Sequence, residues 1–290
     1  MITEKRNVEG EVVVQTHPKD ELIRAERFPH IWCPGCGLGI VLKCYVEAVA
    51  KSSTPPDKHV CVSGIGCTSR MPGYMNLDTY HTTHGRAIPF ATGIKIVNPE
   101  LKVTVVAGDG DLFNIGGNHI IHAARRNMDL TVLCVNNFNY GMTGGQHGST
   151  TPVGARTSTT PYGSIEHPFN IPNMVASLGA PYVARWTTIH VRQLVKAISH
   201  ALEKDGFGFV EILSPCPPTF GELNAFPEGL DEMEYFRKYS VHDDNANLKK
   251  VGLAMKEPEP IVVGNFVDER KPSFIQLERA LIEKVRSGQR

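Results

Sequence analysis

The sequence predicts an α/β protein built on a doubly wound parallel sheet. From about residue 59 onward, short apolar runs alternate with longer helical segments. Continuous apolar runs are typical of parallel strands that are covered on both faces. Nearly every run also leads directly into an unusual loop, as expected where ligands bind beyond the carboxyl ends of the strands.

The expected strands occupy residues 59–64, 103–108, 130–136, 181–185 and 207–213. The expected helices occupy residues 38–51, 118–127, 189–204 and 274–287. We predict one domain, in which the α/β part (59–220) carries an N-terminal extension (1–58) and a C-terminal extension (221–290). Apart from its closing helix, the C-terminal extension is expected to be irregular.

The composition argues against several classes of partner. Thirty Lys and Arg residues balance thirty Asp and Glu residues, which gives no reason to expect nucleic acid or a membrane surface. No apolar run approaches the roughly twenty residues of a membrane span, and the first residues lack the apolar stretch of a secretory signal. We therefore expect a cytoplasmic protein, in which clustered cysteines serve as metal ligands rather than as disulfides.

The motif GDGD (108–111) and the pair NN (136–137) end consecutive expected strands. The glycines allow a sharp turn that approaches a phosphate closely, and a diphosphate calls for a bridging cation. Mg²⁺ prefers oxygen ligands, which Asp109, the side chain of Asn137 and the backbone carbonyl of Asn139 can supply. A glycine turn alone recurs by chance, but a parallel sheet brings these two motifs together. Their spacing resembles the thiamine diphosphate signature.

Four of the seven cysteines lie in loops that should meet at the same edge of the sheet. Cys33 and Cys36 form a CxxC within WCPGCG, Cys67 follows the first strand and Cys216 follows the last. Four converging thiolates suit Zn²⁺ or a 4Fe–4S cluster, and a redox cluster has a purpose beside thiamine. The other three cysteines fall in apolar segments and are expected to be core residues: Cys44, Cys61 and Cys134.

Together these motifs resemble the β subunit of 2-oxoacid:ferredoxin oxidoreductases over about residues 28–220. The shared segments are WCPGCG, VSGIGCTSR, HTTHGRA, AGDGDLFNIGGNH, NNFNYGMTGGQ and SPCPP. The resemblance implies the diphosphate-side thiamine fold and one 4Fe–4S cluster on Cys33, Cys36, Cys67 and Cys216. It implies that Asp109, Asn137 and the carbonyl of Asn139 are the protein ligands of Mg²⁺. It also places the cofactor against the backbone of Ile65, Gly66, Cys67, Thr68, Gly110, Asp111, Gly141 and Met142.

The resemblance also implies a reaction and its partners. A 2-oxoacid is decarboxylated on thiamine diphosphate, the cluster passes the electrons to ferredoxin, and coenzyme A takes the acyl group. A second thiamine domain is not found in this sequence, and the family carries it on an α subunit. An αβ or (αβ)₂ assembly is therefore expected. The direction, oxidative or CO₂-fixing, depends on the potential of the ferredoxin.

Two further residues are candidates for binding substrate. Arg70 follows Cys67 by three residues and could pair with the second carboxylate of 2-oxoglutarate. The alternatives are an exposed arginine or one that contacts the partner subunit. His84 could hydrogen-bond substrate or phosphate, or could be a structural histidine. Asp111 could be only a charge at the start of a helix.

The motifs are compatible with other functions as well. A pyruvate or broad-specificity oxidoreductase is the alternative to a 2-oxoglutarate enzyme. A non-redox thiamine enzyme would not need the four cysteines, and an electron-transfer subunit that carries only a cluster would not need GDGD and NN.

Overall fold

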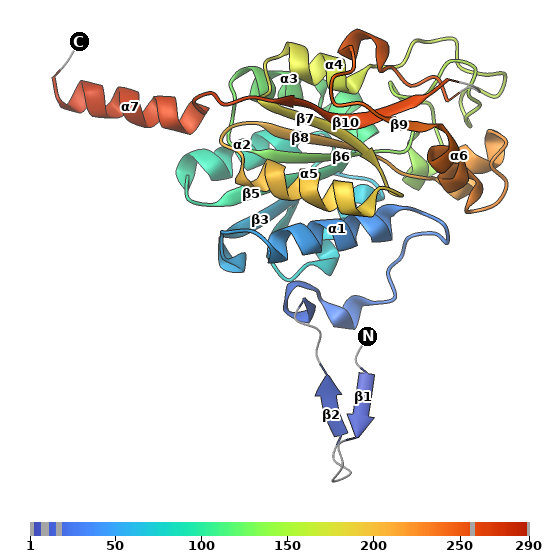
Figure 1. The fold of residues 1–290 in the computed structure, drawn as a ribbon, viewed down its shortest axis with the longest axis horizontal. Helices are drawn as coiled ribbons and strands as arrows, with labels where there is room; N and C mark the ends of the chain where they lie inside the picture. The colour runs from blue at the N-terminus through green and yellow to red at the C-terminus, as the bar shows by residue number, and fades with distance from the viewer. Residues whose placement is uncertain (1–2, 7–11, 16–18, 256–258, 289–290) are drawn as a thin grey trace.

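The computed structural model describes residues 3–6, 12–15, 19–255 and 259–288. Its centre is an eight-stranded sheet in the order β4-β3-β5-β6-β8-β7-β10-β9 (Figure 1). The strands are β3 (His59–Ser63), β4 (Asp78–His81), β5 (Lys102–Gly108), β6 (Thr131–Asn136), β7 (Tyr182–Thr187), β8 (Gly208–Leu213), β9 (Ser240–His242) and β10 (Ile261–Asp268). β10 runs antiparallel to β7, and the other neighbouring pairs are parallel.

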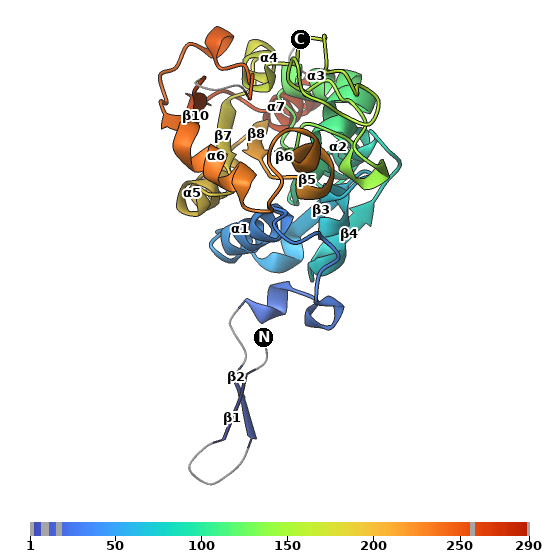
Figure 2. The same ribbon diagram turned by 90° about the vertical axis from the view of Figure 1, so that its right-hand side faces the viewer.

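Helices cover both faces of the sheet (Figures 1 and 2). α1 (Leu38–Ala50) and α5 (Val191–Glu203) bury their apolar residues in one core cluster. α2 (Ala87–Val97), α3 (Gly117–Arg125) and α4 (Ile171–Ser177) contribute to a second cluster. Strands β3, β5, β6, β7 and β8 lie between these layers, which explains why their sequences are apolar runs without alternation. The predicted fold class is confirmed.

The five predicted strands and four predicted helices all form, with ends that differ from the prediction by one or two residues. Strand β4 was not predicted. It lies at the edge of the sheet, and three of its four residues are exposed, so its sequence DTYH carries no apolar pattern. Edge strands of this kind are short and polar, and periodicity does not detect them.

The expectation that residues beyond 220 are irregular before the closing helix is wrong. This region forms α6 (Asp231–Tyr239) and strands β9 and β10, and β10 pairs with β7. The pairing is interrupted by a bulge between Asn265 and Val267, which breaks the apolar alternation that would mark a strand. The last helix, α7 (Phe274–Arg286), begins with a capping box between Ser273 and Gln276 and extends away from the body (Figure 1).

At the other end of the chain, β1 (Thr3–Arg6) and β2 (Val12–Gln15) pair antiparallel. Within the described residues, no helix combines the length and the apolar character needed to cross a membrane.

The carboxyl ends of β3, β5, β6 and β8 meet at one edge of the sheet. The chain passes from β3 to β4 on one side and then to β5 on the other, so the direction of winding reverses between β3 and β5. In open α/β sheets the loops at such a reversal form a crevice that binds ligands.

Candidate active site: two adjoining cavities

A cavity lies at this reversal and is lined by the loops after β3, β5 and β6. Every residue predicted to contact thiamine diphosphate or Mg²⁺ lines it, and so does His84. The lining residues that were predicted are Ile65, Gly66, Cys67, Thr68, His84, Asp109, Gly110, Asp111, Asn137, Asn139, Gly141 and Met142. The structure therefore brings together residues from four separate segments of the chain.

Asp109 is the acidic centre of this cavity. Its side chain is buried, which raises the pKa of the carboxyl to about 6 despite a hydrogen bond from the Thr150 hydroxyl to Oδ2. Thr150 was not predicted. It lies 41 positions from Asp109 in a loop rich in Ser and Thr, so no local pattern distinguishes it from its neighbours.

The side-chain oxygen of Asn137 faces only other acceptors. If its amide is turned over, the nitrogen donates to Asp109 Oδ1 at 3.2 Å and to the backbone carbonyl of Asn139 at 2.8 Å. When the amide is not turned over, the side-chain oxygens of Asp109 and Asn137 and the backbone oxygen of Asn139 face one another with no proton between them. Such oxygens repel each other unless a cation lies among them, and this donor set is the one that Mg²⁺ prefers. The residues present therefore fit a bound Mg²⁺.

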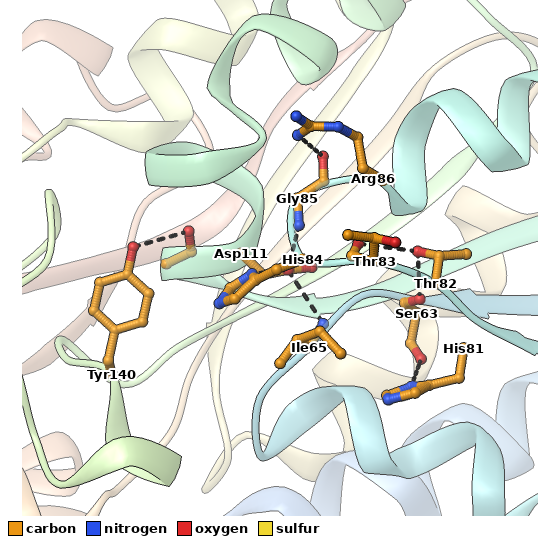
Figure 3. Close-up of polar contacts among 11 residues, drawn as sticks. Ser63, Ile65, His81, Thr82, Thr83, His84, Gly85, Arg86, Asp111 and Tyr140 are labelled. Carbon is orange, nitrogen blue, oxygen red and sulfur yellow. Dashed lines mark hydrogen bonds and ion pairs between the residues drawn. The ribbon is translucent and has the colours of Figure 1, made fainter.

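Asp111 links three loops around the same cavity (Figure 3). Its Oδ1 accepts hydrogen bonds from the backbone N–H groups of Ile65 at 3.2 Å and Gly85 at 2.7 Å, and from Nδ1 of His84. Oδ2 is buried and has no hydrogen-bond partner among the described residues. Asp111 is thus more than a charge at a helix start, because it fixes the loop after β3 and the HTTHG loop to the GDGD turn.

Close packing explains the glycine next to this carboxylate. A Cβ at Gly64 would lie 2.6 Å from Cγ of Asp111, so a larger residue would displace the carboxylate or the loop. On the opposite wall, the ring of Tyr140 stands edge-on to the ring of His84, with centroids 6.1 Å apart, and its hydroxyl donates to the carbonyl of Gly110 at 3.4 Å (Figure 3). His84 is therefore held on two sides.

A second cavity of about 250 Å³ is lined by all four predicted ligand cysteines, Cys33, Cys36, Cys67 and Cys216. Burial above all, with smaller contributions from the neighbouring Cys216, Cys67 and Cys33, raises the pKa of Cys36 to about 12. Among the described residues, no three His, Cys, Asp or Glu side chains are close enough as they stand to hold a metal ion. The four thiols line one cavity but do not converge on a single ion position. Four thiolates are the usual ligands of a 4Fe–4S cluster, so this set of donors suits one.

The C-terminal part of the chain contacts the loops that carry these cysteines. The backbone N–H of Cys216 donates to Oε2 of Glu232 in α6 at 3.0 Å, and burial raises the pKa of Glu232 to about 8. A Cβ at Gly35, which lies between the two cysteines of the CxxC, would be 2.5 Å from the carbonyl of Gly229. Neither Glu232 nor Gly229 was predicted, because both act through contacts with distant loops.

The two cavities adjoin. They share four lining residues, Cys67, Asn137, Gly141 and Met142. A Cβ at Gly141 would lie 3.1 Å from Sγ of Cys216 and 3.4 Å from Nδ2 of Asn137, so one glycine separates a proposed cluster ligand from a proposed Mg²⁺ ligand.

Arg70 lines neither cavity; it lies in a third pocket with Arg24 and Arg27. Cys44, Cys61 and Cys134 are core residues, as predicted.

Comparison with known proteins identifies the class and then the family. Residues 64–212 match the family described as the thiamine pyrophosphate enzyme C-terminal TPP-binding domain, so the chain is a thiamine diphosphate enzyme domain. It is 48% identical to the 2-oxoglutarate synthase subunit KorB of Methanocaldococcus jannaschii, over 93% of this chain and 99% of that protein. The corresponding figures for the Archaeoglobus fulgidus subunit are 44%, 93% and 96%.

A solved structure agrees with this assignment. The 2-oxoglutarate:ferredoxin oxidoreductase from Magnetococcus marinus, determined with 2-oxoglutarate, coenzyme A and succinyl-CoA bound, superimposes with a TM-score of 0.81. The two chains are 32% identical, and the match covers 95% of this chain and 92% of the other. This chain belongs to the β subunits of the 2-oxoacid:ferredoxin oxidoreductases, as its motifs indicated.

Proposed function

We propose that this chain, together with an α subunit, catalyses the oxidative decarboxylation of 2-oxoglutarate to its acyl-CoA and CO₂ with ferredoxin as the electron acceptor. The observation that carries the proposal is the contact between the two cavities, which share Cys67, Asn137, Gly141 and Met142. A decarboxylation that must release electrons needs its redox centre next to the reacting carbon, and a non-redox thiamine enzyme has no use for the second cavity.

In this proposal Asp109, Asn137 and the carbonyl of Asn139 hold Mg²⁺, and the GDGD turn receives the diphosphate. Thiamine diphosphate supplies the electron sink that stabilises negative charge on the substrate carbon. Thr150 orients the Asp109 carboxylate by its hydrogen bond to Oδ2. Burial raises the pKa of Asp109 to about 6, and a bound cation would favour the ionised form and lower this pKa again.

Cys33, Cys36, Cys67 and Cys216 hold the cluster in this proposal. Their thiols must lose protons when the cluster binds, and Cys36 and Cys67 have pKa values raised by burial to about 12 and about 11. The hydrogen bond from Nε1 of Trp32 to the carbonyl of Cys67, at 2.8 Å, fixes the loop that runs between the two cavities. Electrons would leave beside Cys33, the exposed member of the set.

The cofactor cavity on this chain has a volume of about 110 Å³, well below the roughly 300–1,000 Å³ of typical small-molecule sites. A second domain is needed to complete it, in agreement with a β subunit that works with an α subunit. We infer an (αβ)₂ assembly in which the partner covers the exposed Ile65 and Met142 at the mouth of the cavity.

Two-electron oxidation of the substrate distinguishes this function from its alternatives. The chain is co-expressed with its partner, purified without oxygen, and analysed for iron, sulfide and visible absorption. We expect about four irons per β chain, with absorption that is bleached by 2-oxoglutarate plus coenzyme A and restored by oxidised ferredoxin. Bleaching by pyruvate alone would favour the broad-specificity or pyruvate enzyme. A colourless protein that contains zinc would refute the redox function.

A further inference from the structure

The side chain of Thr219 connects the cysteine cavity to the turn that carries the proposed Mg²⁺ ligands. Its Oγ1 lies 2.9 Å from Sγ of Cys216 and donates a hydrogen bond to Oδ1 of Asn139 at 3.2 Å. Nδ2 of Asn139 in turn donates to the backbone carbonyl of Asn137 at 3.2 Å. A continuous row of polar contacts therefore runs from a proposed cluster ligand to two proposed Mg²⁺ ligands.

A tight turn holds Thr219 in this place. The carbonyl of Cys216 accepts hydrogen bonds from the N–H groups of Phe220 at 3.1 Å and Gly221 at 3.0 Å, so the chain folds back directly after the cysteine. The loop after β6 packs against the threonine, because a Cβ at Gly145 would lie 2.8 Å from Cβ of Thr219. The contact between these two loops fixes the half-buried side chain of Thr219 beside the sulfur.

The hydroxyl of Thr219 has one proton and two neighbouring acceptors. While Cys216 carries its thiol proton, the S–H group can donate to Oγ1, and the hydroxyl donates to Asn139. A cysteine gives up that proton when it ligates a metal or a cluster. The sulfur is then an acceptor only, and the hydroxyl 2.9 Å away is a donor within its reach. The state of the sulfur therefore decides which acceptor receives the hydroxyl proton.

We propose that Thr219 is a positioning residue that sets the reduction potential of the cluster: its hydroxyl donates a hydrogen bond to the ligating sulfur of Cys216 and favours the reduced cluster. Reduction adds one electron, which comes from the oxidation of the substrate, and a hydrogen bond strengthens as its acceptor gains negative charge. Hydrogen bonds to the sulfurs are among the factors that set the potential of an iron–sulfur cluster. Thr219 acts in this way only under the proposed function, which supplies the cluster and its electrons.

Cofactor affinity distinguishes this role from service to Asn139. When the hydroxyl donates to the sulfur, Oδ1 of Asn139 has already lost that donor, and the amide of Asn139 retains its bond to Asn137. Removal of the hydroxyl then changes the potential of the cluster and leaves the turn with the proposed Mg²⁺ ligands as it was. If the hydroxyl instead stays on Asn139 in the loaded protein, its removal weakens thiamine diphosphate binding and leaves the potential unchanged.

The test uses the complete complex with Thr219→Val, which replaces the hydroxyl by a methyl group, and Thr219→Ser, which keeps the hydroxyl. Thr92→Val is the matched control, because this half-buried threonine of α2 donates to the carbonyl of Ile88 at 2.8 Å and lines neither cavity. Each complex is analysed for iron and sulfide. The cluster is titrated with redox mediators and followed by electron paramagnetic resonance, and thiamine diphosphate affinity is measured at fixed Mg²⁺.

Thr219→Val should shift the reduction equilibrium of the cluster by roughly tenfold toward the oxidised form, which for one electron is a potential about 59 mV more negative. Iron content and cofactor affinity should stay unchanged, and Thr219→Ser and Thr92→Val should keep the wild-type potential. If Thr219→Val loses iron, Thr219→Ala, which adds no atom to the site, replaces it in the redox titration.

An unchanged potential in Thr219→Val with a normal iron content would overturn the role of Thr219 and leave the proposed function intact. Weaker cofactor binding without a shift in potential would also overturn it, because the hydroxyl would then serve Asn139. Iron loss in both Thr219→Val and Thr219→Ala would reduce the residue to a structural role. A wild-type complex without iron would refute the proposed function, and the role of Thr219 with it.

Discussion

Arg185 of β7 and Glu211 of β8 are register partners and form an ion pair in the interior of the sheet, with Nε and Oε2 2.7 Å apart and both side chains fully buried. The other oxygen of Glu211 accepts a hydrogen bond from Nδ2 of Asn136 at 2.8 Å. Oδ1 of Asn136 in turn accepts from the N–H of Phe138 at 3.1 Å. The ion pair therefore supports the turn that carries the proposed Mg²⁺ ligands.

Variants of this network can separate an effect on the stability of the fold from an effect on cofactor binding. Glu211→Leu alone should destabilise the fold by about 3–5 kcal/mol, because it leaves Arg185 buried without its partner. The double variant Arg185→Met/Glu211→Leu removes both charges and should recover most of that loss. It still deprives Asn136 of its acceptor, so we expect Mg²⁺-dependent thiamine diphosphate binding to stay weaker by roughly tenfold.

Urea unfolding measures the first effect, and titration of thiamine diphosphate at fixed Mg²⁺ measures the second. A double variant that regains both stability and cofactor affinity would reduce the network to a purely structural role.

Gly64→Ala tests the contact between the loop after β3 and Asp111. The added Cβ would lie 2.6 Å from Cγ of Asp111, so the carboxylate must move and release Ile65 and Gly85. We expect at least a tenfold loss of cofactor affinity, of the size typical for misplaced supporting contacts. Gly93→Ala on the exposed side of α2 is the control, because its Cβ meets no atom within 4 Å. It should stabilise the helix by about 0.5–1 kcal/mol.

Substitution of a proposed cluster ligand should lower the iron content of the complex, whereas substitution of a core cysteine should lower only the stability of the fold. Cys33→Ser removes an exposed thiol and should lower the iron and sulfide content and the visible absorption of the purified complex, with little change in folding. Cys44→Ala removes a buried thiol that lies outside the cavity and should cost about 1 kcal/mol of stability while the iron content stays constant. Equal iron loss in both variants would argue against the ligand assignment.

The burial of His59 leads us to expect that the free energy of unfolding depends on pH. Its ring is buried and Nε2 lies 3.2 Å from the carbonyl of Thr54, and burial lowers the pKa of the ring below its ordinary value. In the unfolded chain the ring takes up a proton near pH 6.5. The unfolded state thus binds more protons below that pH, and stability falls as the pH drops through 6.5 until the lowered folded pKa is passed.

His59→Gln can keep the hydrogen bond to Thr54 but does not titrate. Urea unfolding at pH 7.5 and 5.5 should therefore show a smaller loss of stability in the variant than in the wild type. The same loss in both proteins would assign the pH dependence to other groups.

The sequence was sufficient for the features that depend on local pattern. The buried strands appear as continuous apolar runs, and the motifs at their carboxyl ends locate Asp109, Asn137, Cys67 and Cys216 at one edge of the sheet. β4 and β10 escaped prediction because one is a polar edge strand and the other is interrupted by a bulge. Propensity and periodicity describe neighbours along the chain and carry no information on these positions.

The sequence by itself thus determined the fold class, the thiamine and cysteine motifs and the family. Only the tertiary structure decided that Thr150 donates a hydrogen bond to Asp109, that Asp111 joins three loops and that Glu232 accepts a hydrogen bond from the backbone of Cys216. It also decided that Arg70 lies with Arg24 rather than in the cofactor cavity. The physical reason is that each of these contacts joins residues many positions apart. Their distance in space is set by how the sheet, its covering helices and its loops pack together, and no local pattern of residues encodes it.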